Sequence, residues 1–180
     1  MTLKSLNIDK NWTLFLDRDG VINKKKDNDY VKEWIEFHFL KGSLDALKKL
    51  NSLFGTIVVV TNQQGIGKGL YRTEELELIH KNMLYEIDYM KGRIDKVYFS
   101  PYKNEENHPT RKPGTGMAEL AKKDFPNIDF KRSVMVGDSM TDMEFGKKLA
   151  MTTVFISDEK KEDEKIDFNF KSLLEFSNSL

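Results

Sequence analysis

The chain alternates short apolar segments with longer amphipathic ones, and this alternation constrains its fold more than any other feature. The short segments are rich in β-branched and aromatic residues, which is typical of strands covered on both faces. They predict five strands, at 13–16, 56–61, 96–100, 133–139 and 151–156. The other segments place apolar residues at helical spacing and predict helices at 43–54, 73–90, 114–125, 140–150 and 171–178.

Strands that alternate with helices need crossover connections. The predicted fold is therefore a three-layer, Rossmann-like α/β fold, a doubly wound and mainly parallel sheet with helices on both faces. Ser43 and Thr73 are the predicted N-caps of the first two helices. A length of 180 residues favours one domain over residues 1–180, with the charged run 157–165 as a solvated loop.

Composition excludes several classes of function. Lys and Arg together number 29, as do Asp and Glu, so the net charge of zero favours binding to neither nucleic acid nor an anionic membrane. The absence of cysteine excludes disulfides and thiolate metal sites and fits a reducing compartment. With no membrane-length apolar run and no apolar signal core, we expect a cytoplasmic protein. A compact single domain also favours a monomer.

Polar side chains follow the predicted strands at the point where each strand ends. Asp17 and Asp19 follow the first strand, Thr61 and Asn62 end the second, and Asp138 ends the fourth. In an open parallel sheet, ligands bind outside the carboxyl ends of the strands. We therefore expect these side chains to share one site.

The carboxylates in this set indicate a metal-assisted reaction at phosphorus. Asp17, Asp19 and Asp138 offer the hard oxygen ligands that suit Mg²⁺, whereas three scattered histidines and no cysteine argue against zinc. Asp17 can attack a phosphate as nucleophile and form an aspartyl-phosphate. Asp19 can protonate the leaving oxygen and then activate water.

Neutral and cationic groups complete the predicted phosphate site. Thr61 and Asn62 offer donors for phosphoryl oxygens, while Arg111 and Lys112 offer positive charge to the transferring group. Together with the carboxylates, these residues predict a phosphoric monoester hydrolase, a phosphatase.

Motifs in a fixed order carry a family resemblance over almost the whole chain. "FLDRDGVIN", "TNQQGIGKGLY", "RKPGTGM" and "VGDSMTDM" occur in that order between residues 13 and 156. They resemble the haloacid dehalogenase (HAD) superfamily phosphatases of subfamily IIIA, and within them the group of heptose bisphosphate phosphatases and histidinol-phosphatases. The resemblance implies a HAD-like fold with no cap domain or a minimal one.

The resemblance also implies a role for each motif residue. Asp17 would be nucleophile and metal ligand, and Asp19 the general acid/base, which also touches the metal through its backbone carbonyl. Asp138 would complete the Mg²⁺ site, with Asp142 as an outer support. Lys112 would bridge the nucleophile and the phosphate.

Further contacts are implied around the phosphate. Thr61 and Asn62 would bind it, and Arg111 would contact the substrate beside it. In place of a cap, three short loops would shape the pocket: 24–30, 63–71 and 100–110.

One stretch departs from the family pattern. Many relatives carry a zinc-binding loop of cysteines and a histidine just before the Arg-Lys motif, but "SPYKNEENHPTRKPG" holds His108 alone. We therefore expect no zinc. Lys68 also stands where relatives usually have arginine, so the loops around the pocket leave the exact substrate open.

Several interpretations of the function stay open. The predicted substrate is a small phosphorylated metabolite, D-glycero-D-manno-heptose 1,7-bisphosphate losing its 7-phosphate, ahead of histidinol phosphate. A phospho-receiver signalling module would also use an acidic cluster, but its phosphorylated Asp would end the third strand, and "KVYFSPY" has none. A polynucleotide 3′-phosphatase would share the DxDG motif, although the neutral net charge argues against nucleic acid.

Other residues near these motifs have less specific interpretations. Strand alternation predicts that Arg18 points away from Asp17. His80 is expected to be a packing or surface residue on its helix. Lys24–Lys26 could attract a second anionic group of the substrate or form an exposed loop, and Trp34 is expected to pack.

Overall fold

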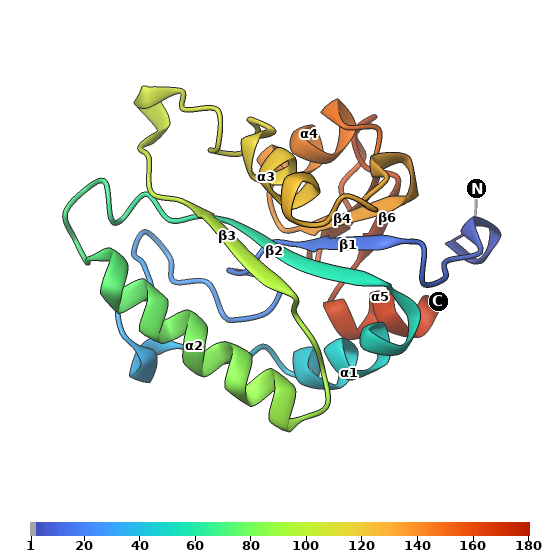
Figure 1. Cartoon of the computed structure of the whole chain (residues 1–180), viewed down its shortest axis with the longest axis horizontal. Coiled ribbons are helices and arrows are strands. Elements are labelled where there is room, and N and C mark those ends of the chain that lie inside the picture. Colours follow the sequence, from blue (N-terminus) through green and yellow to red (C-terminus); the bar gives the residue numbers. More distant parts are fainter. Residues whose placement is uncertain (1–2) are drawn as a thin grey trace.

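The computed structural model describes residues 3–180, which are built around a six-stranded parallel sheet with strand order β3-β2-β1-β4-β5-β6 (Figure 1). The strands are β1 Thr13–Leu16, β2 Thr56–Asn62, β3 Lys96–Ser100, β4 Ser133–Gly137, β5 Thr152–Ile156 and β6 Phe168–Phe170. The α-helices are α1 Ser43–Leu53, α2 Thr73–Tyr89, α3 Gly116–Asp124, α4 Met140–Lys148 and α5 Leu173–Ser179. Short 3₁₀ helices lie at Leu3–Leu6, Trp34–Glu36, Asn104–Glu106 and Phe130–Arg132.

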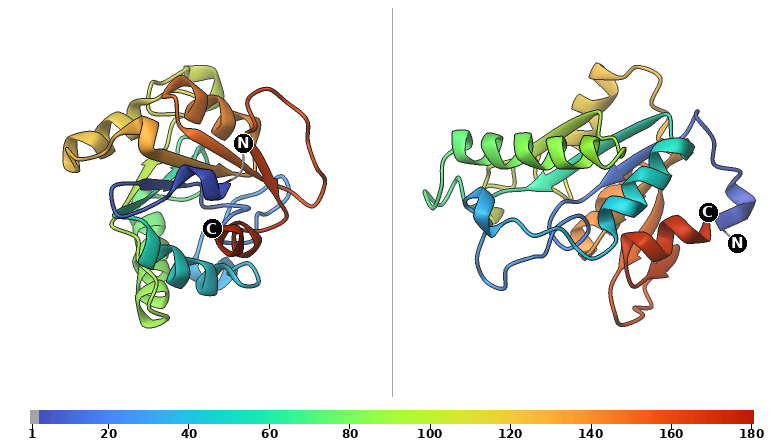
Figure 2. Two further views of the ribbon diagram at one scale, coloured as in Figure 1. Left: turned by 90° about the vertical axis from the view of Figure 1, so that its right-hand side faces the viewer. Right: turned by 90° about the horizontal axis from the view of Figure 1, so that it is seen from below.

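Helices cover both faces of the sheet. α1, α2 and α5 lie on one face, and α3 and α4 lie on the other (Figures 1 and 2). Leu14 and Leu16 of β1 pack into the core of the first face, whereas Phe15 packs with Met117 of α3 and Phe145 of α4. Side chains alternate across a strand, so one apolar strand serves both cores. The predicted doubly wound, three-layer α/β fold is confirmed.

The register of the sheet brings the strand ends to one edge. Leu16, the last residue of β1, pairs with Val59 of β2 and with Val136 of β4. Asp17 follows directly, and its backbone N–H donates to the carbonyl of Val136 at 2.9 Å. Because neighbouring strands run in the same direction, Asp138 follows β4 at the same edge.

The predicted N-caps are each one residue too late. Gly42 caps α1 in a left-handed conformation (φ 79°), which glycine adopts without strain, and Ser43 is the first helical residue. Arg72 precedes α2, where its backbone N–H donates to the Glu75 carboxylate at 2.7 Å. At α1 no side chain within residues 3–180 accepts from the first backbone N–H groups, and at α2 the Glu75 carboxylate fixes the backbone of the N-cap residue, so neither predicted hydroxyl acts as a cap.

Two further elements differ from the prediction. α3 begins at Gly116 instead of 114, because the Gly116 N–H donates to the Pro109 carbonyl and residues 111–114 form a turn. β6 was not predicted; it spans three half-buried residues that pair with β5. Within residues 3–180, none of the helices combines the length and apolarity that crossing a bilayer requires.

Candidate active site

A cavity of about 250 Å³ opens at the carboxyl edge of the sheet. All of the predicted site residues line it: Asp17, Asp19, Thr61, Asn62, Arg111, Lys112, Asp138 and Asp142. They come from the ends of three strands, from the start of α4 and from the loop before α3. The structure therefore brings together residues that are far apart in the sequence, as the strand-end pattern predicted.

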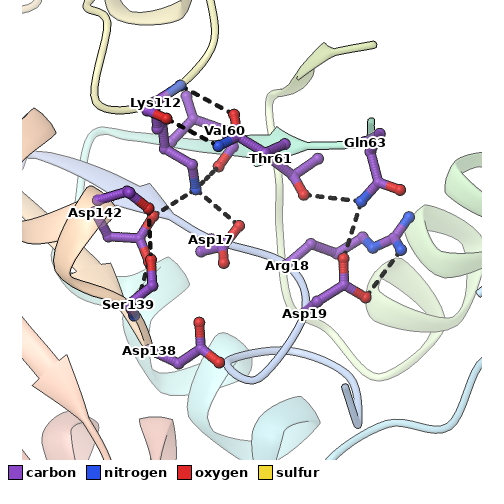
Figure 3. A network of polar contacts seen from close by, with 12 residues as sticks. Asp17, Arg18, Asp19, Val60, Thr61, Gln63, Lys112, Asp138, Ser139 and Asp142 are labelled. Atoms are coloured by element: carbon purple, nitrogen blue, oxygen red, sulfur yellow. Dashed lines mark hydrogen bonds and ion pairs between the residues drawn. The ribbon is translucent and has the colours of Figure 1, made fainter. Parts of the chain in front are cut away.

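A buried lysine joins two of the carboxylates. The Lys112 ammonium nitrogen lies 2.8 Å from Oδ1 of Asp17 and 2.6 Å from Oδ1 of Asp142 (Figure 3). It also donates to the Val60 carbonyl at 2.7 Å. Burial alone would lower the pKa of Lys112, but the Asp142 and Asp17 carboxylates hold it above its ordinary value. Lys112 is therefore a permanent cation beside the expected nucleophile.

Asn62 holds the backbone that carries Lys112. Its Oδ1 accepts from the Lys112 backbone N–H at 3.0 Å, and its Nδ2 donates to the Lys112 carbonyl at 3.1 Å. An amide nitrogen carries two hydrogens, so the second N–H is not used by this contact. Asn62 thus positions Lys112, and its phosphate contact stays a prediction.

The start of α4 fixes Asp142 below the pocket. Its Oδ2 accepts from the backbone N–H of Ser139 at 3.1 Å and from the Ser139 hydroxyl at 2.6 Å, a capping box. Gly137 leaves room for this carboxylate, because a Cβ at that position would overlap it. Asp142 is completely buried, so it acts on the pocket through Lys112 and its own charge.

Asp138 lies at the rim of the same cluster. Its Oδ2 accepts from the Lys25 ammonium group at 2.8 Å, while its Oδ1 is buried without a hydrogen-bond partner among residues 3–180. Burial raises the pKa of Asp138, and the contact with Lys25 opposes this effect. Gly20, at a φ of 87°, makes room here too, since a Cβ would overlap the Asp138 carboxylate.

These carboxylates fit a divalent cation. Asp17, Asp138 and Asp142 each place an oxygen within 4.8 Å of the others. Burial raises the pKa of Asp17 to about 7; Lys112 opposes the rise, and Asp142 and Asp138 add to it. A hard cation such as Mg²⁺ would pair with the unpartnered Asp138 oxygen and relieve the repulsion. The predicted ligand set contained Asp19 instead of Asp142, with Asp19 contributing its backbone carbonyl.

The Asp19 side chain faces a separate set of donors. Its Oδ1 accepts from Arg18 Nη2 at 2.9 Å, and its Oδ2 accepts from Gln63 Nε2 at 2.9 Å (Figure 3). Oδ1 also accepts from Asn23 Nδ2 at 2.9 Å. Burial alone would raise the pKa of Asp19, but the positive charge of Arg18 and the hydrogen bonds from Arg18, Asn23 and Gln63 hold it below its ordinary value. Asp19 is therefore ionised when no substrate is bound.

Sequence reasoning missed the residues that hold Asp19. Arg18 was expected only to point away from Asp17; its guanidinium is fully buried, contacts Asp19 and lies 3.1 Å from His80 Nε2. Gln63 also donates to Thr61 Oγ1 at 3.0 Å, which leaves the threonine hydroxyl proton for another acceptor. The sequence did offer one signal for Gln63, because this polar residue directly follows the end of β2 and so lies at the same edge of the sheet as the other site residues.

Cations lie around the cavity mouth. Arg111 lines the cavity and donates to the Tyr102 carbonyl at 3.1 Å, and burial lowers its pKa. Lys25 and Lys26 also line the cavity, and Lys26 pairs with Glu36 at 2.7 Å. Lys68 lies 3.1 Å from the Tyr30 hydroxyl. Two of the three lysines in 24–26 thus have acidic partners.

Comparison with known proteins places this site in a family. A family model described as polynucleotide kinase 3 phosphatase matches residues 9–177. D-glycero-alpha-D-manno-heptose-1,7-bisphosphate 7-phosphatase of Mycobacterium tuberculosis is 38% identical over 139 residues, 77% of this chain and 73% of the relative. The chain belongs to the HAD-like phosphatases. The corresponding Campylobacter jejuni enzyme is 34% identical over 169 residues, 94% of this chain and 95% of the relative.

Solved HAD-like structures agree with the fold. D,D-heptose 1,7-bisphosphate phosphatase from B. bronchiseptica, crystallised with magnesium and phosphate, superposes with a TM-score of 0.83 at 26% identity, covering 93% of this chain and 96% of that one. A HAD-like phosphatase structure from Mesorhizobium loti gives 0.79 at 27% identity, covering 93% and 83%. The predicted family, fold class and enzyme class, phosphoric monoester hydrolase, are confirmed.

Proposed function

We propose that this chain, as a single catalytic domain, is a Mg²⁺-dependent phosphomonoesterase that removes the 7-phosphate of D-glycero-D-manno-heptose 1,7-bisphosphate through an aspartyl-phosphate. The observation that carries the proposal is Lys112, whose ammonium group lies between Asp17 and Asp142 at the edge of a carboxylate cluster. The names of the relatives support the substrate. Those relatives include enzymes named for the alpha and for the beta anomer, so the proposal leaves the anomer open.

The first half-reaction transfers the phosphoryl group to Asp17. Lys112 holds Oδ1 of Asp17, so Oδ2 is the oxygen for attack on phosphorus. Asp19, ionised in the free protein, takes up a proton from solvent as the anionic substrate binds and gives it to the alcohol oxygen as that oxygen leaves. Lys112 and the Thr61 hydroxyl stabilise the charge on the transferring oxygens.

The second half-reaction hydrolyses the aspartyl-phosphate. Asp19 takes a proton from water as the water oxygen attacks phosphorus, and phosphate leaves Asp17. Asp17 and Asp138 would hold Mg²⁺, with Asp142 supporting them through Lys112. The bound metal would supply Lewis-acid polarisation of a phosphoryl oxygen.

Phosphate release by the purified protein tests the proposal. The panel contains both anomers of the heptose bisphosphate, histidinol phosphate and sugar monophosphates, each with Mg²⁺ and with chelator. We expect the highest kcat/KM on a heptose bisphosphate and none from Asp17→Asn. Equal and feeble rates on the whole panel would refute the substrate, and a fully active Asp17→Asn would refute the covalent mechanism.

The description of the matching family model favours a second candidate, hydrolysis of a 3′-phosphate on a polynucleotide. The net charge of zero argues against it, because phosphate-backbone binding depends on surplus Lys and Arg. A 3′-phosphorylated oligonucleotide in the same panel decides the matter. A kcat/KM above that of every sugar phosphate, falling steeply with salt, would replace the heptose bisphosphate with this substrate.

A further inference from the structure

A buried contact links helix α2 to the acid/base residue. His80 lies on α2 and is only 7% exposed, and its Nε2 is 3.1 Å from Nη1 of Arg18. The other guanidinium nitrogen, Nη2, donates to Oδ1 of Asp19 at 2.9 Å. Arg18 thus spans from the helix to the carboxylate, and the proposed mechanism gives neither Arg18 nor His80 a role.

The chemistry of the pair sets the direction of the contact. A guanidinium has only donors, so Nε2 of His80 accepts and its ring proton lies on Nδ1. The guanidinium carbon also lies 5.9 Å from the centre of the Phe37 ring, which covers one of its faces. The contacts with His80, Asp19 and the Phe37 ring therefore fix the orientation of the Arg18 guanidinium. Because the guanidinium is planar and rigid, its orientation determines where its hydrogen bond holds the Asp19 carboxylate.

The two oxygens of Asp19 are not equivalent in this arrangement. Oδ1 accepts from Arg18 and from Asn23, so both of its lone pairs are used in hydrogen bonds. Oδ2 accepts from Gln63 alone among residues 3–180. The Tyr71 hydroxyl donates to Gln63 Oε1 at 2.6 Å, so the Gln63 amide nitrogen is turned toward Asp19.

We propose that Arg18 and His80 act as a positioning pair, which holds Asp19 so that Oδ2 is the atom that transfers the proton. The proposal rests on the phosphatase mechanism above and adds to it which oxygen works and what orients it. Arg18 and His80 do not touch the substrate in this account; they act through Asp19.

The transferred proton can be followed through both half-reactions. Asp19 is ionised in the free protein, so its Oδ2 first takes up a proton from solvent as the anionic substrate binds. In the first half-reaction, a bond forms between Asp17 and phosphorus, the bond from phosphorus to the alcohol oxygen breaks, and that proton passes from Oδ2 to the alcohol oxygen. In the second, a water oxygen bonds to phosphorus, its proton returns to Oδ2, and the bond to Asp17 breaks. Protonation of the leaving oxygen matters most when the leaving group is a poor one.

A pair of aryl phosphates of similar shape isolates this effect. Nitrophenolate leaves p-nitrophenyl phosphate without protonation, whereas phenolate is a poorer leaving group. The value of kcat/KM reports the steps up to release of the alcohol, so it senses the acid but not hydrolysis of the aspartyl-phosphate. We expect His80→Leu to lower kcat/KM about 10-fold on phenyl phosphate and less than about twofold on p-nitrophenyl phosphate, part of the 10²–10⁴ that a general acid supplies.

Two matched variants separate positioning from packing. His80→Gln keeps a hydrogen-bond acceptor for Arg18 and should restore most of the loss on phenyl phosphate. Met83→Leu changes another buried side chain of α2 and should leave the ratio between the two substrates unchanged. Thermal melts establish that each variant is folded.

The outcomes distinguish this inference from the function on which it rests. If His80→Leu lowers kcat/KM equally on both substrates, or His80→Gln fails to restore it, the positioning role is wrong. Asp19→Asn is the reference: it must show the same dependence on leaving group, only larger. If Asp19→Asn shows the dependence and His80→Leu does not, only the inference fails; if Asp19→Asn shows none, the acid/base mechanism itself fails.

Discussion

The Lys112 ammonium nitrogen lies 2.8 Å from Oδ1 of Asp17, although the two residues are 95 positions apart in the chain. The same ammonium group lies 2.6 Å from Asp142, whose side chain is completely buried. One cation therefore serves two carboxylates, and Asp138 brings a third to within 4.8 Å. The cluster keeps a surplus of negative charge, which a divalent cation can neutralise at the place where phosphate would bind.

Replacing Lys112 by Met removes the only buried cation that touches Asp17 within residues 3–180. We expect kcat/KM to fall by about 100-fold or more, the cost typical of losing one preorganised group that stabilises a transition state. Unfolding stability should also fall by about 3–5 kcal/mol, because Asp142 is left buried without its counter-ion. Phosphate release and urea unfolding measure the two effects.

The matched control is Lys123→Met, an exposed lysine on α3. It removes the same charge and should change neither quantity. A Lys112→Met protein with near wild-type kcat/KM would show that the ion pair with Asp17 has no part in the reaction.

Asp17→Asn should abolish turnover and stabilise the metal-free protein in alkaline buffer. Burial raises the pKa of Asp17 from 3.8 to about 7, so the folded state binds this proton more tightly than the unfolded state does. The carboxylate consequently costs stability that grows as the pH rises between those two values, and the amide removes a cost of up to a few kcal/mol. The melting temperature with chelator present measures it.

Exposed Asp158→Asn is the control, with no expected change. Added Mg²⁺ should reverse the order, because it binds the wild-type carboxylate better than the amide. Equal melting temperatures of wild type and Asp17→Asn, with chelator and above about pH 7, would contradict the destabilising charge.

Strand positions could be predicted because their apolar runs are continuous, whereas weaker local signals gave wrong or missing elements. β6 has only three residues, each half-buried, and it follows the charged run 157–165. Its pairing with β5 depends on the sheet already being formed. The N-cap of α1 is Gly42 and not the predicted Ser43, because a left-handed turn precedes the helix. Helical periodicity in the sequence does not reveal such a turn.

The site could be predicted where its residues follow strands, and not where two elements must first pack. Asp17, Thr61 and Asp138 each lie within one residue of a strand end, and parallel pairing brings them together. The contact between Arg18 and His80 depends on how α2 lies against the sheet. Sequence periodicity shows which helix face is apolar but does not show which polar group that face will meet.

Removing Mg²⁺ should abolish activity reversibly, and Asp138→Asn should raise the Mg²⁺ concentration needed for half-maximal rate by about 10-fold or more. The reason is that Oδ1 of Asp138 is buried without a hydrogen-bond partner among residues 3–180, and that Asp138 places a carboxylate oxygen within 4.8 Å of those of Asp17 and Asp142. Calorimetric titration of the metal into the protein measures the affinity without turnover. Glu159→Gln, an exposed acid, is the control; unchanged Mg²⁺ affinity in Asp138→Asn would remove Asp138 from the site.

Acidification should destabilise the wild-type protein more than His80→Gln. Burial and the Arg18 charge lower the pKa of His80 from 6.5 to about 3, so between these values the unfolded chain binds a proton that the folded protein does not. The stability that neutral His80 contributes is therefore fully present above its unfolded pKa of 6.5. It decreases as the pH falls below that value, by about 2 kcal/mol at about pH 5. For a domain of this size, that difference corresponds to roughly 4–8 °C in melting temperature.

Melting temperatures at about pH 7 and about pH 5, with chelator present, measure the drop in each protein. His38→Gln, at an exposed histidine, should keep the wild-type drop, and an equal drop in His80→Gln would show that His80 is not held neutral against Arg18.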